Sequence, residues 1–243
     1  MVPQEHKVAL ITGAGRGIGR ATALALARDG YDLCLEARTF DDLAETRRLS
    51  NLPASRALIV LIDLAEAEAA ANLFEAALDH FGRLDVLVNN AGWAPPRTSL
   101  VKLRPDDLER MIAVNLHAPL ALARLAAIQM AMQEGRGVIV NVGSIAGRDP
   151  VAGEAVYAAV KAGLVAFTRS CVAEFRPLGV RTAVIIPGLT DTSFIPPNKR
   201  LDRAAMLRPE DVAAAVLGVV NATPGCAPVE IVVEPARDPM RAR

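Results

Sequence analysis

Tyr157 and Lys161 lie four residues apart in an alanine-rich stretch, YAAVK, whose composition predicts a helix. Side chains four residues apart share one face of a helix, so the ammonium and the phenol are expected to be neighbours. A nearby cation favours the phenolate and lowers the tyrosine pKa from its reference value of about 10. The spacing therefore predicts a tyrosine that exchanges a proton near neutral pH, although a solvated helix face can carry the same pair.

Two polar residues upstream extend this constellation. Ser144 follows the strand-like run GVIVNV by one glycine, thirteen residues before Tyr157, so a short loop can bring its hydroxyl beside the phenol. A turn or helix-capping role accounts for the same serine. Asn115 interrupts a long helical pattern, where asparagine is disfavoured. Asn115 is therefore expected either to bond to backbone groups in the core or to bind a water.

The segment 12–19, TGAGRGIG, predicts a phosphate-binding turn between the first strand and the first helix. Glycine permits positive φ and lets a ligand approach the backbone. The helix that follows offers free N–H groups and the positive end of its dipole to an anion. The spacing is T-G-x-x-x-G-x-G rather than G-x-G-x-x-G, whose third glycine would fall on Ile18. A tight turn with no ligand is the alternative.

Polar residues also end the third and fourth predicted strands. Asp63 stands in LIDL, where its carboxylate can accept from an adenine amino group or cap the next helix. Asn89 opens NNAG at 89–92, whose amides can brace the sheet edge or line a cofactor groove. Ligands of open α/β sheets bind at the carboxyl ends of the strands, so these positions point to one site.

These residues need a scaffold of short apolar strands and longer amphipathic helices in strict alternation. Apolar runs without alternation indicate strands covered on both faces. The pattern predicts a single α/β domain over 1–243, a Rossmann-type doubly wound parallel sheet of about seven strands with helices on both faces. Prolines 187, 196 and 197 mark 187–208 as the substrate loop. Strands are expected at 7–12, 31–37, 56–64, 84–92, 137–144, 180–188 and 229–233, and helices at 17–30, 39–51, 65–82, 106–135, 155–175 and 208–221.

Composition argues against several other classes of protein. Lys plus Arg equals Asp plus Glu, at 27 each, and aromatic residues make up only 4% of the chain, so no nucleic-acid partner is expected. The three cysteines, Cys34, Cys171 and Cys226, have no metal-ligand spacing and are expected to be buried free thiols; no metal site is predicted. We expect a soluble cytoplasmic protein with no membrane partner, because the amino-terminal segment is too polar for a signal peptide.

The chain resembles the short-chain dehydrogenase/reductases over residues 7–234. TGAGRGIG, NNAG, Asn115, Ser144, YAAVK and the Pro-Gly pair at 187–188 occur in the order of that family. The resemblance implies an oxidoreductase that binds a nicotinamide dinucleotide. The cofactor residues that it implies are Thr12, Gly13, Gly15, Arg16, Gly17, Ile18, Gly19, Arg38, Asp63, Leu64, Asn89, Ala91, Gly92, Tyr157, Lys161, Pro187, Gly188 and Thr190.

The resemblance also implies a mechanism. Hydride passes between the nicotinamide and a small-molecule carbonyl or alcohol, and Tyr157 is the general acid/base. Ser144 orients the substrate oxygen, Lys161 lowers the tyrosine pKa and holds the nicotinamide ribose, and Asn115 holds a water that relays protons to Lys161. A homotetramer is implied. The substrate pocket is expected near Trp93, Ala94, Ile145, Val151, Ala152, Glu154, Leu189 and Phe194.

Two questions stay open at this stage. The first is whether the chain is instead a catalytically silent dinucleotide-binding regulator or redox sensor; the complete set of four catalytic residues weighs against this. The second is the choice of cofactor. The family's acidic position falls on Ala37, and Arg38 and Arg16 can bind a 2′-phosphate, so NADP(H) is favoured and NAD(H) is possible. A bulge in the second strand would instead turn Glu36 toward the ribose.

Overall fold

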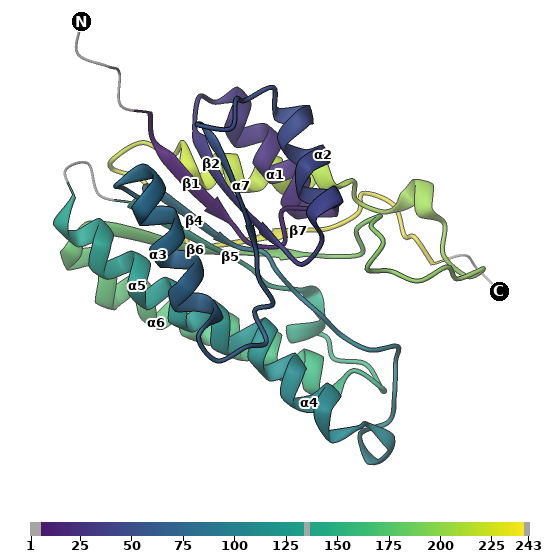
Figure 1. Cartoon of the computed structure of the whole chain (residues 1–243). Helices are drawn as coiled ribbons and strands as arrows, with labels where there is room; N and C mark the ends of the chain where they lie inside the picture. Colours follow the sequence, from purple (N-terminus) through teal and green to yellow (C-terminus); the bar gives the residue numbers. More distant parts are fainter. Residues whose placement is uncertain (1–5, 134–136, 241–243) are drawn as a thin grey trace, which may run out of the picture.

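The computed structural model describes residues 6–133 and 137–240. Its centre is one sheet of seven parallel strands in the order β3-β2-β1-β4-β5-β6-β7 (Figure 1). This confirms the predicted fold class. The strands are β1 (Val8–Ile11), β2 (Asp32–Ala37), β3 (Ala57–Leu61), β4 (Val86–Asn89), β5 (Gly137–Val142), β6 (Val180–Pro187) and β7 (Glu230–Val233).

Helices cover both faces of the sheet (Figure 1). Consecutive strand residues point to opposite faces, so Ala9 packs with α1, α2 and α7, whereas Leu10 packs with α3 and α5. Both cores are apolar, which explains why the strands carry no polar alternation. The α-helices are α1 (Gly17–Arg28), α2 (Phe40–Ser50), α3 (Ala69–Phe81), α4 (Pro105–Ile112), α5 (Ala118–Met132), α6 (Ala155–Phe175) and α7 (Pro209–Val220).

The chain reverses its direction across the sheet between β3 and β4. It builds β1, β2 and β3 toward one edge and then returns to place β4 on the other side of β1. Such a switch point leaves a crevice at the carboxyl ends of the two central strands. Thr12 ties the two ends together, because its Oγ1 accepts from the backbone N–H groups of Asn90 at 3.0 Å and Ala91 at 2.9 Å.

The single helix expected at 106–135 is wrong in detail. Between α4 and α5 the chain forms a π-helical turn (Ala113–His117), in which the N–H of Ala118 bonds to the carbonyl of Ala113. Pro119 follows and has no N–H to offer to the carbonyl four residues earlier, which favours a wider turn there. The helical periodicity continues through this turn, so the pattern shows no break. Residues 134 and 135 of the expected helix lie outside the described residues.

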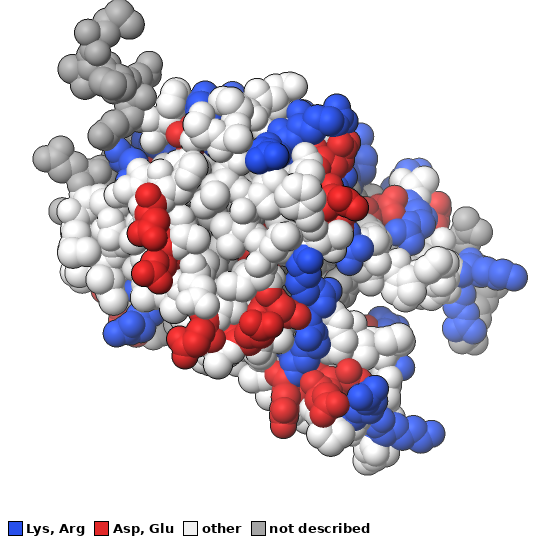
Figure 2. Space-filling model, in the orientation of Figure 1, with Lys and Arg blue, Asp and Glu red and all other residues white. Residues whose placement is uncertain are grey.

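The two longest helical stretches are strongly apolar. Pro105–Met132 and Ala155–Leu178 are long and apolar enough to cross a membrane by length and composition, with mean hydropathies of 1.6 and 1.3. Half of the first window and 39% of the second are buried inside the protein, and the core helices of soluble proteins pass the same test. Figure 2 shows acidic and basic side chains interspersed on one face of the molecule.

The cysteines differ from the prediction at one position. Cys34 and Cys171 are buried free thiols, as expected, but Cys226 is exposed. Cys226 lies in the turn between α7 and β7, where no helix covers it. Over residues 6–133 and 137–240, no group of three or more His, Cys, Asp or Glu side chains gathers as a metal site would require.

Candidate active site

A cleft of about 440 Å³ opens at the carboxyl ends of the strands. Most of the residues named from the sequence line it, although they come from seven separate segments of the chain. The lining residues among them are Gly13, Gly15, Arg16, Gly17, Ile18, Arg38, Asp63, Leu64, Ala91, Gly92, Ser144, Tyr157, Lys161, Pro187, Gly188 and Thr190. Thr12, Gly19, Asn89 and Asn115 are buried behind this lining.

The glycine turn is held in shape by its packing against β4. Gly13 has a positive φ of 63°. A Cβ added to Gly19 would lie 2.1 Å from the carbonyl oxygen of Gly13 and 2.5 Å from Nδ2 of Asn90, so no side chain fits there. Asn90 Nδ2 donates to the carbonyl of Thr12 at 2.9 Å. Asn90 thus braces the turn, a role that the sequence analysis did not assign to it.

The start of α1 fits an anionic group. Gly17 and Ile18, in its first turn, line the cleft, and no side chain caps the helix from Arg16. The first N–H groups of a helix have no partner within the helix, and the dipole places positive charge at that end. The residues present therefore fit the pyrophosphate of a dinucleotide.

The side chain of Asn89 could either brace the edge of the sheet or line the groove, and its hydrogen bonds distinguish the two. Nδ2 of Asn89 donates to Oδ1 of Asn141 at 2.9 Å and to the carbonyl of Pro119 at 3.2 Å. Asn141 in turn donates to Thr168 of α6 at 2.8 Å. Asn89 therefore braces β4 against β5 and α5 rather than lining the groove.

Glu36 lines the cleft under the glycine turn and is bonded to that turn. Strands β2 and β3 pair regularly through Glu36 and Ala37, with no bulge. The Glu36 side chain is buried, and its Oε2 accepts from the N–H of Gly13 at 3.0 Å. Burial raises the pKa of Glu36 to about 7; the bond from Gly13 opposes this shift and the charge of Asp63 adds to it. The carboxyl group is thus a brace for the turn.

The raised pKa of Glu36 predicts a pH-dependent stability. The folded-state pKa of about 7 lies above the ordinary value of 4.5, so the folded state binds more protons between these pH values. The stabilisation from this group is complete below the ordinary pKa and is lost as pH rises through 7. Glu36→Gln is expected to remove that loss. The free energy of unfolding of the variant minus that of wild type should therefore increase by about 2 kcal/mol from pH 5 to pH 8.

Urea denaturation of wild type and Glu36→Gln at several pH values measures this difference. Glu75→Gln, which changes an exposed carboxyl of α3, is the control and should follow wild type. Parallel pH curves for Glu36→Gln and wild type would contradict a buried, titrating Glu36.

Ser144, Tyr157 and Lys161 meet at the centre of the cleft. Ser144 and Tyr157 both line the cleft, and the Ser144 hydroxyl lies close enough to the phenol to lower the pKa of Tyr157. Lys161 Nζ donates to the carbonyl of Val142 at 2.9 Å and lies 5.8 Å from the centre of the Tyr157 ring. Lys161 is buried, and this burial lowers its pKa to about 8. The serine, the phenol and the ammonium are therefore brought together as the sequence predicted.

The expected fall in the pKa of Tyr157 is wrong for the protein without ligand. Burial raises the pKa of Tyr157 to about 12, the nearby Ser144 hydroxyl opposes this shift, and the charge of Glu154 adds to it. The Lys161 ammonium lies over the ring and bonds to the Val142 carbonyl, and its effect on the phenol does not outweigh the burial of the hydroxyl. Tyr157 is consequently a neutral phenol at neutral pH and is equipped to donate a proton.

Asn115 uses its side chain to hold the loop after β4. Its Nδ2 donates to the carbonyls of Met111 at 2.9 Å and Trp93 at 2.7 Å, and its Oδ1 accepts from the Trp93 N–H at 3.3 Å. This agrees with the backbone-bonding alternative. A Cβ on Gly92 would lie 3.2 Å from Asn115 Oδ1 and 3.9 Å from Lys161 Nζ, so both groups approach one spot. A water between them stays a prediction.

Asp63 is already engaged on both of its oxygens. Oδ1 accepts from the N–H of Ala65 at 3.0 Å, and Oδ2 pairs with Arg110 at 2.6 Å. Burial alone would raise the pKa of Asp63, but the bonds from Arg110 and Ala65 hold it below the ordinary value. Asp63 caps a turn and not a helix, because α3 begins later, at Ala69. Arg110, which also stacks 5.4 Å over the Trp93 ring, was missed from the sequence.

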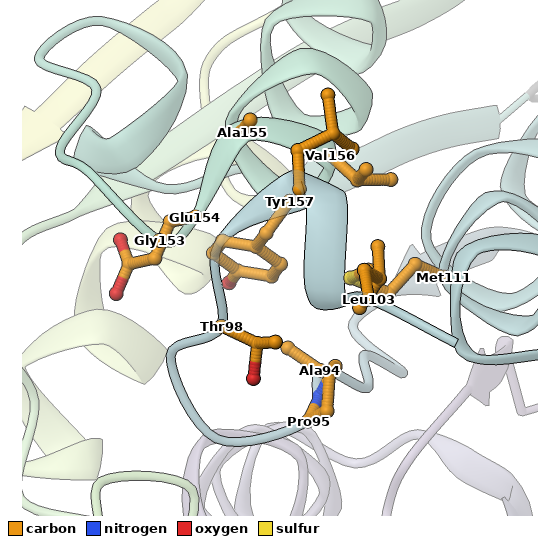
Figure 3. Close-up of a pocket in the computed structure, with 11 residues that line it drawn as sticks. Ala94, Pro95, Thr98, Leu103, Met111, Gly153, Glu154, Ala155, Val156 and Tyr157 are labelled. Atoms are coloured by element: carbon orange, nitrogen blue, oxygen red, sulfur yellow. The ribbon is translucent and has the colours of Figure 1, made fainter. Parts of the chain in front are cut away.

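The part of the cleft where a substrate pocket was expected is mainly apolar. Six of the residues expected there line it, namely Trp93, Ile145, Val151, Glu154, Leu189 and Phe194. Ala94 instead lines a smaller cavity of about 20 Å³ beside Tyr157. Figure 3 shows Tyr157 projecting from α6 into this cavity, near Thr98, with Leu103 and Met111 at its other side. Ala152 lines neither space.

Charged residues at the rim of the cleft were not expected. Arg97 and Asp149 also line it, and Arg97 forms an ion pair with Glu154. The pair joins the loop after β4 to the start of α6, and the Thr98 N–H bonds to the Gly153 carbonyl at 3.0 Å in the same place. No local pattern in the sequence marks this contact, since its partners are 57 residues apart.

Known proteins resemble this chain over most of its length. The family model described as short chain dehydrogenase matches residues 7–201. The cis-4-hydroxycyclohexanecarboxylate dehydrogenase of Sinomonas cyclohexanicum is 37% identical over 222 residues, which cover 87% of this chain and 88% of that protein. The match to the family model includes the glycine turn and the segment of Ser144, Tyr157 and Lys161.

Solved structures show the same fold. A metagenomic short-chain oxidoreductase in complex with NADP matches with a TM-score of 0.83 and 34% identity, covering 95% of this chain and 98% of that one. The 3-ketoacyl-(acyl-carrier-protein) reductase from Brucella melitensis complexed with NADH matches with a TM-score of 0.86 and 27% identity, covering 96% and 98%. The chain belongs to the short-chain dehydrogenase family and is an NAD(P)-dependent oxidoreductase.

Proposed function

We propose that this protein reduces a small carbonyl compound to an alcohol with NADPH, and that it catalyses the reverse oxidation by the same groups. The observation that carries the proposal is the neutral Tyr157 phenol, close to Ser144 and beside the buried Lys161, in one cleft with the glycine turn. A proton donor and an anion site at opposite ends of one cleft suit a reaction that adds a hydride and a proton to a carbonyl.

Each part of the cleft has a role in holding the cofactor. The start of α1 would bind the pyrophosphate, and Arg38 with Arg16 would bind a 2′-phosphate. Pro187, Gly188 and Thr190 would lie against the nicotinamide, at the end of β6. When bound, NADPH supplies the hydride for the carbonyl carbon.

The protein's own groups handle the oxygen and its proton. Ser144 donates a hydrogen bond to the substrate oxygen and orients it, and Tyr157 transfers its proton to that oxygen as negative charge develops there. The tyrosine is left as a phenolate, which the Lys161 ammonium stabilises from 5.8 Å off the ring centre. The acid form of the tyrosine is present at neutral pH before the reaction.

A steady-state assay of NADPH oxidation against cyclic ketones, aliphatic ketones and 3-oxoacyl thioesters tests the proposal. We expect turnover with at least one class, and NADP⁺ reduction with the matching alcohol. Cofactor binding without turnover of any compound, measured by the fluorescence of the sole tryptophan Trp93, would instead identify a silent binding protein.

The preference for NADP(H) rests on the end of β2. Ala37 has no carboxylate to accept from a ribose 2′-hydroxyl, and Arg38 lines the cleft beside it. The Glu36 carboxylate accepts a hydrogen bond from the N–H of Gly13. The metagenomic relative carries NADP, which supports this reading, whereas the Brucella relative carries NADH, so NAD(H) remains a second cofactor to test.

Replacing this pair is expected to reverse the cofactor preference. Ala37→Asp/Arg38→Leu adds an acceptor for the 2′-hydroxyl and removes the phosphate partner. The ratio of kcat/KM for NADPH over NADH should fall by about 100-fold, and wild type should prefer NADPH. Kinetics of both enzymes with both cofactors measure the ratio. A wild-type preference for NADH, or an unmoved ratio in the double variant, would show that the phosphate is read elsewhere.

We also propose a homotetramer in the cytoplasm. Ile112, Ile128 and Met132 are exposed along α4 and α5, which gives these helices an apolar outer side. A symmetric arrangement of four chains can cover such sides in pairs. Sedimentation is expected to show one species of about four times the 25.7 kDa chain mass. A single species at the chain mass at micromolar concentration would contradict the proposal.

A further inference from the structure

A short segment after β6 crosses the cleft and touches both of its ends. We call residues 189–195 the lid. Thr192 faces the start of α1, since a Cβ on Gly17 would lie 3.1 Å from its Cγ2. The ring of Phe194 lies 5.8 Å, centre to centre, from the ring of Tyr157. The position of the lid therefore affects the anion site and the proton donor together.

The lid has little packing of its own. Asp191, Thr192 and Ile195 are only partly buried, and Ser193 and Phe194 are exposed. The base of the lid is held by two backbone bonds, from Leu207 N–H to Leu189 at 3.0 Å and from Asp191 N–H to Leu207 at 2.8 Å. Beyond that base, the conformation depends on hydrogen bonds rather than on apolar burial.

Arg203 supplies those bonds from a single guanidinium. Its Nε donates to Asp191 Oδ1 at 2.6 Å, its Nη2 to the Thr192 carbonyl at 2.8 Å and its Nη1 to the Ile195 carbonyl at 3.2 Å. The three acceptors span the part of the lid that faces the cleft. A planar fork of donors fixes their mutual positions, which the single ammonium of a lysine cannot do.

Arg203 itself stands on a firm support. It begins a short 3₁₀ helix (Arg203–Ala205), which Asp202 caps through the Ala204 N–H at 3.2 Å. The Asp202 N–H bonds to the Pro239 carbonyl at 2.8 Å, and Leu201 pairs with Met240. Figure 1 shows this carboxyl-terminal segment running beside the lid region. The guanidinium is therefore held from outside the lid.

We infer that Arg203 is a positioning residue. It holds the lid across the cofactor cleft and against Tyr157 before any ligand binds. Only the expected changes in kcat and in the carbonyl KM rest on the proposed function. Without Arg203, the ligands must order the lid themselves and lose affinity by the free energy of that ordering. Both ligands should then bind more weakly, while the chemical step changes less, because none of the reacting groups is altered.

The test compares Arg203→Ala, Arg203→Lys and Asp191→Ala with wild type. Arg28→Ala, which removes an exposed arginine from the far end of α1, is the matched control. Trp93 fluorescence gives the Kd of NADPH, steady-state kinetics give kcat and KM, and thermal unfolding gives Tm. Trypsin cleavage after Lys199 and Arg200, identified by mass, reports how often the segment beside the lid opens.

For Arg203→Ala we expect the NADPH Kd and the carbonyl KM each to rise about tenfold, with kcat within about threefold of wild type. Cleavage at the two sites should be faster, and saturating NADPH should restore protection. Arg203→Lys and Asp191→Ala should fall between Arg203→Ala and wild type, and Arg28→Ala should match wild type.

Two results would overturn the inference. One is an NADPH Kd and a cleavage rate within about twofold of wild type in both Arg203→Ala and Asp191→Ala. The other is a large fall in Tm with Kd and KM unchanged, which would make Arg203 a support of the fold only. If wild type turns over no carbonyl, the proposed function fails, but the binding and cleavage measurements still decide the role of Arg203.

Discussion

Tyr157→Phe is expected to bind NADPH about as tightly as wild type and to lose most of its turnover. The ring remains, so it keeps its contacts with Phe194 and with the Lys161 ammonium. The hydroxyl that lies close to Ser144 is lost. A positioned general acid contributes about 10²–10⁴-fold to the rate. We expect kcat to fall by that range when chemistry limits turnover, measured as NADPH oxidation at saturating substrate.

Tyr31→Phe is the natural control, because Tyr31 is the only other tyrosine and lies in the core, away from the cleft. It should keep wild-type turnover. If Tyr157→Phe retained more than about half of the wild-type kcat under conditions where chemistry limits the rate, the proton would have to come from another group.

Gly19→Ala is expected to abolish tight cofactor binding with a single methyl group. The added Cβ would lie 2.1 Å from the Gly13 carbonyl oxygen, so the turn and α1 must move apart. Overpacking of this kind costs about 1–3 kcal/mol of stability. Because the start of α1 would hold the pyrophosphate, this movement should weaken binding, and we expect the NADPH Kd to rise by about 10²-fold, which is about 2.8 kcal/mol.

The matched control is Gly218→Ala in α7. There an added Cβ meets nothing within 4 Å, and the residue is exposed in the middle of a helix. Alanine should stabilise the helix by about 0.5–1 kcal/mol and leave the NADPH Kd unchanged. Urea unfolding and fluorescence titration of the two variants measure both quantities. An NADPH Kd for Gly19→Ala within about threefold of wild type would show that the turn adapts to the extra atom.

The sheet could be predicted from the sequence because its strands are short apolar runs between helical periods. The buried pairs, such as Ala9 with α1 and Leu10 with α3, follow from the alternation of side chains once both faces are covered. The π-helical turn at Asn115 could not be located, because three helical segments in register have the periodicity of one. Pro119 was the local sign of that turn.

The site was predictable where a residue type has few uses and was not where a role depends on distant contacts. The glycines, Ser144, Tyr157 and Lys161 stand out by type and spacing. Arg110 and Arg203 look like ordinary surface arginines, and only folding brings them to partners 47 and 12 residues away. The pKa of Tyr157 depends on its depth of burial and on where Lys161 bonds, which spacing along a helix does not determine.

The bonds from Thr12 to the turn after β4 have a consequence for biosynthesis. The acceptor leaves the ribosome 78 residues before its first donor, a delay of roughly 4–16 s at ordinary rates of translation. During that interval β1 has no neighbour on its β4 side, and the glycine turn has none of the bonds from Asn90. The nascent chain up to residue 89 therefore carries the glycine motif of a nucleotide site without the hydrogen bonds that shape it. We therefore expect the cofactor to bind only after Asn90 has emerged and these hydrogen bonds have formed.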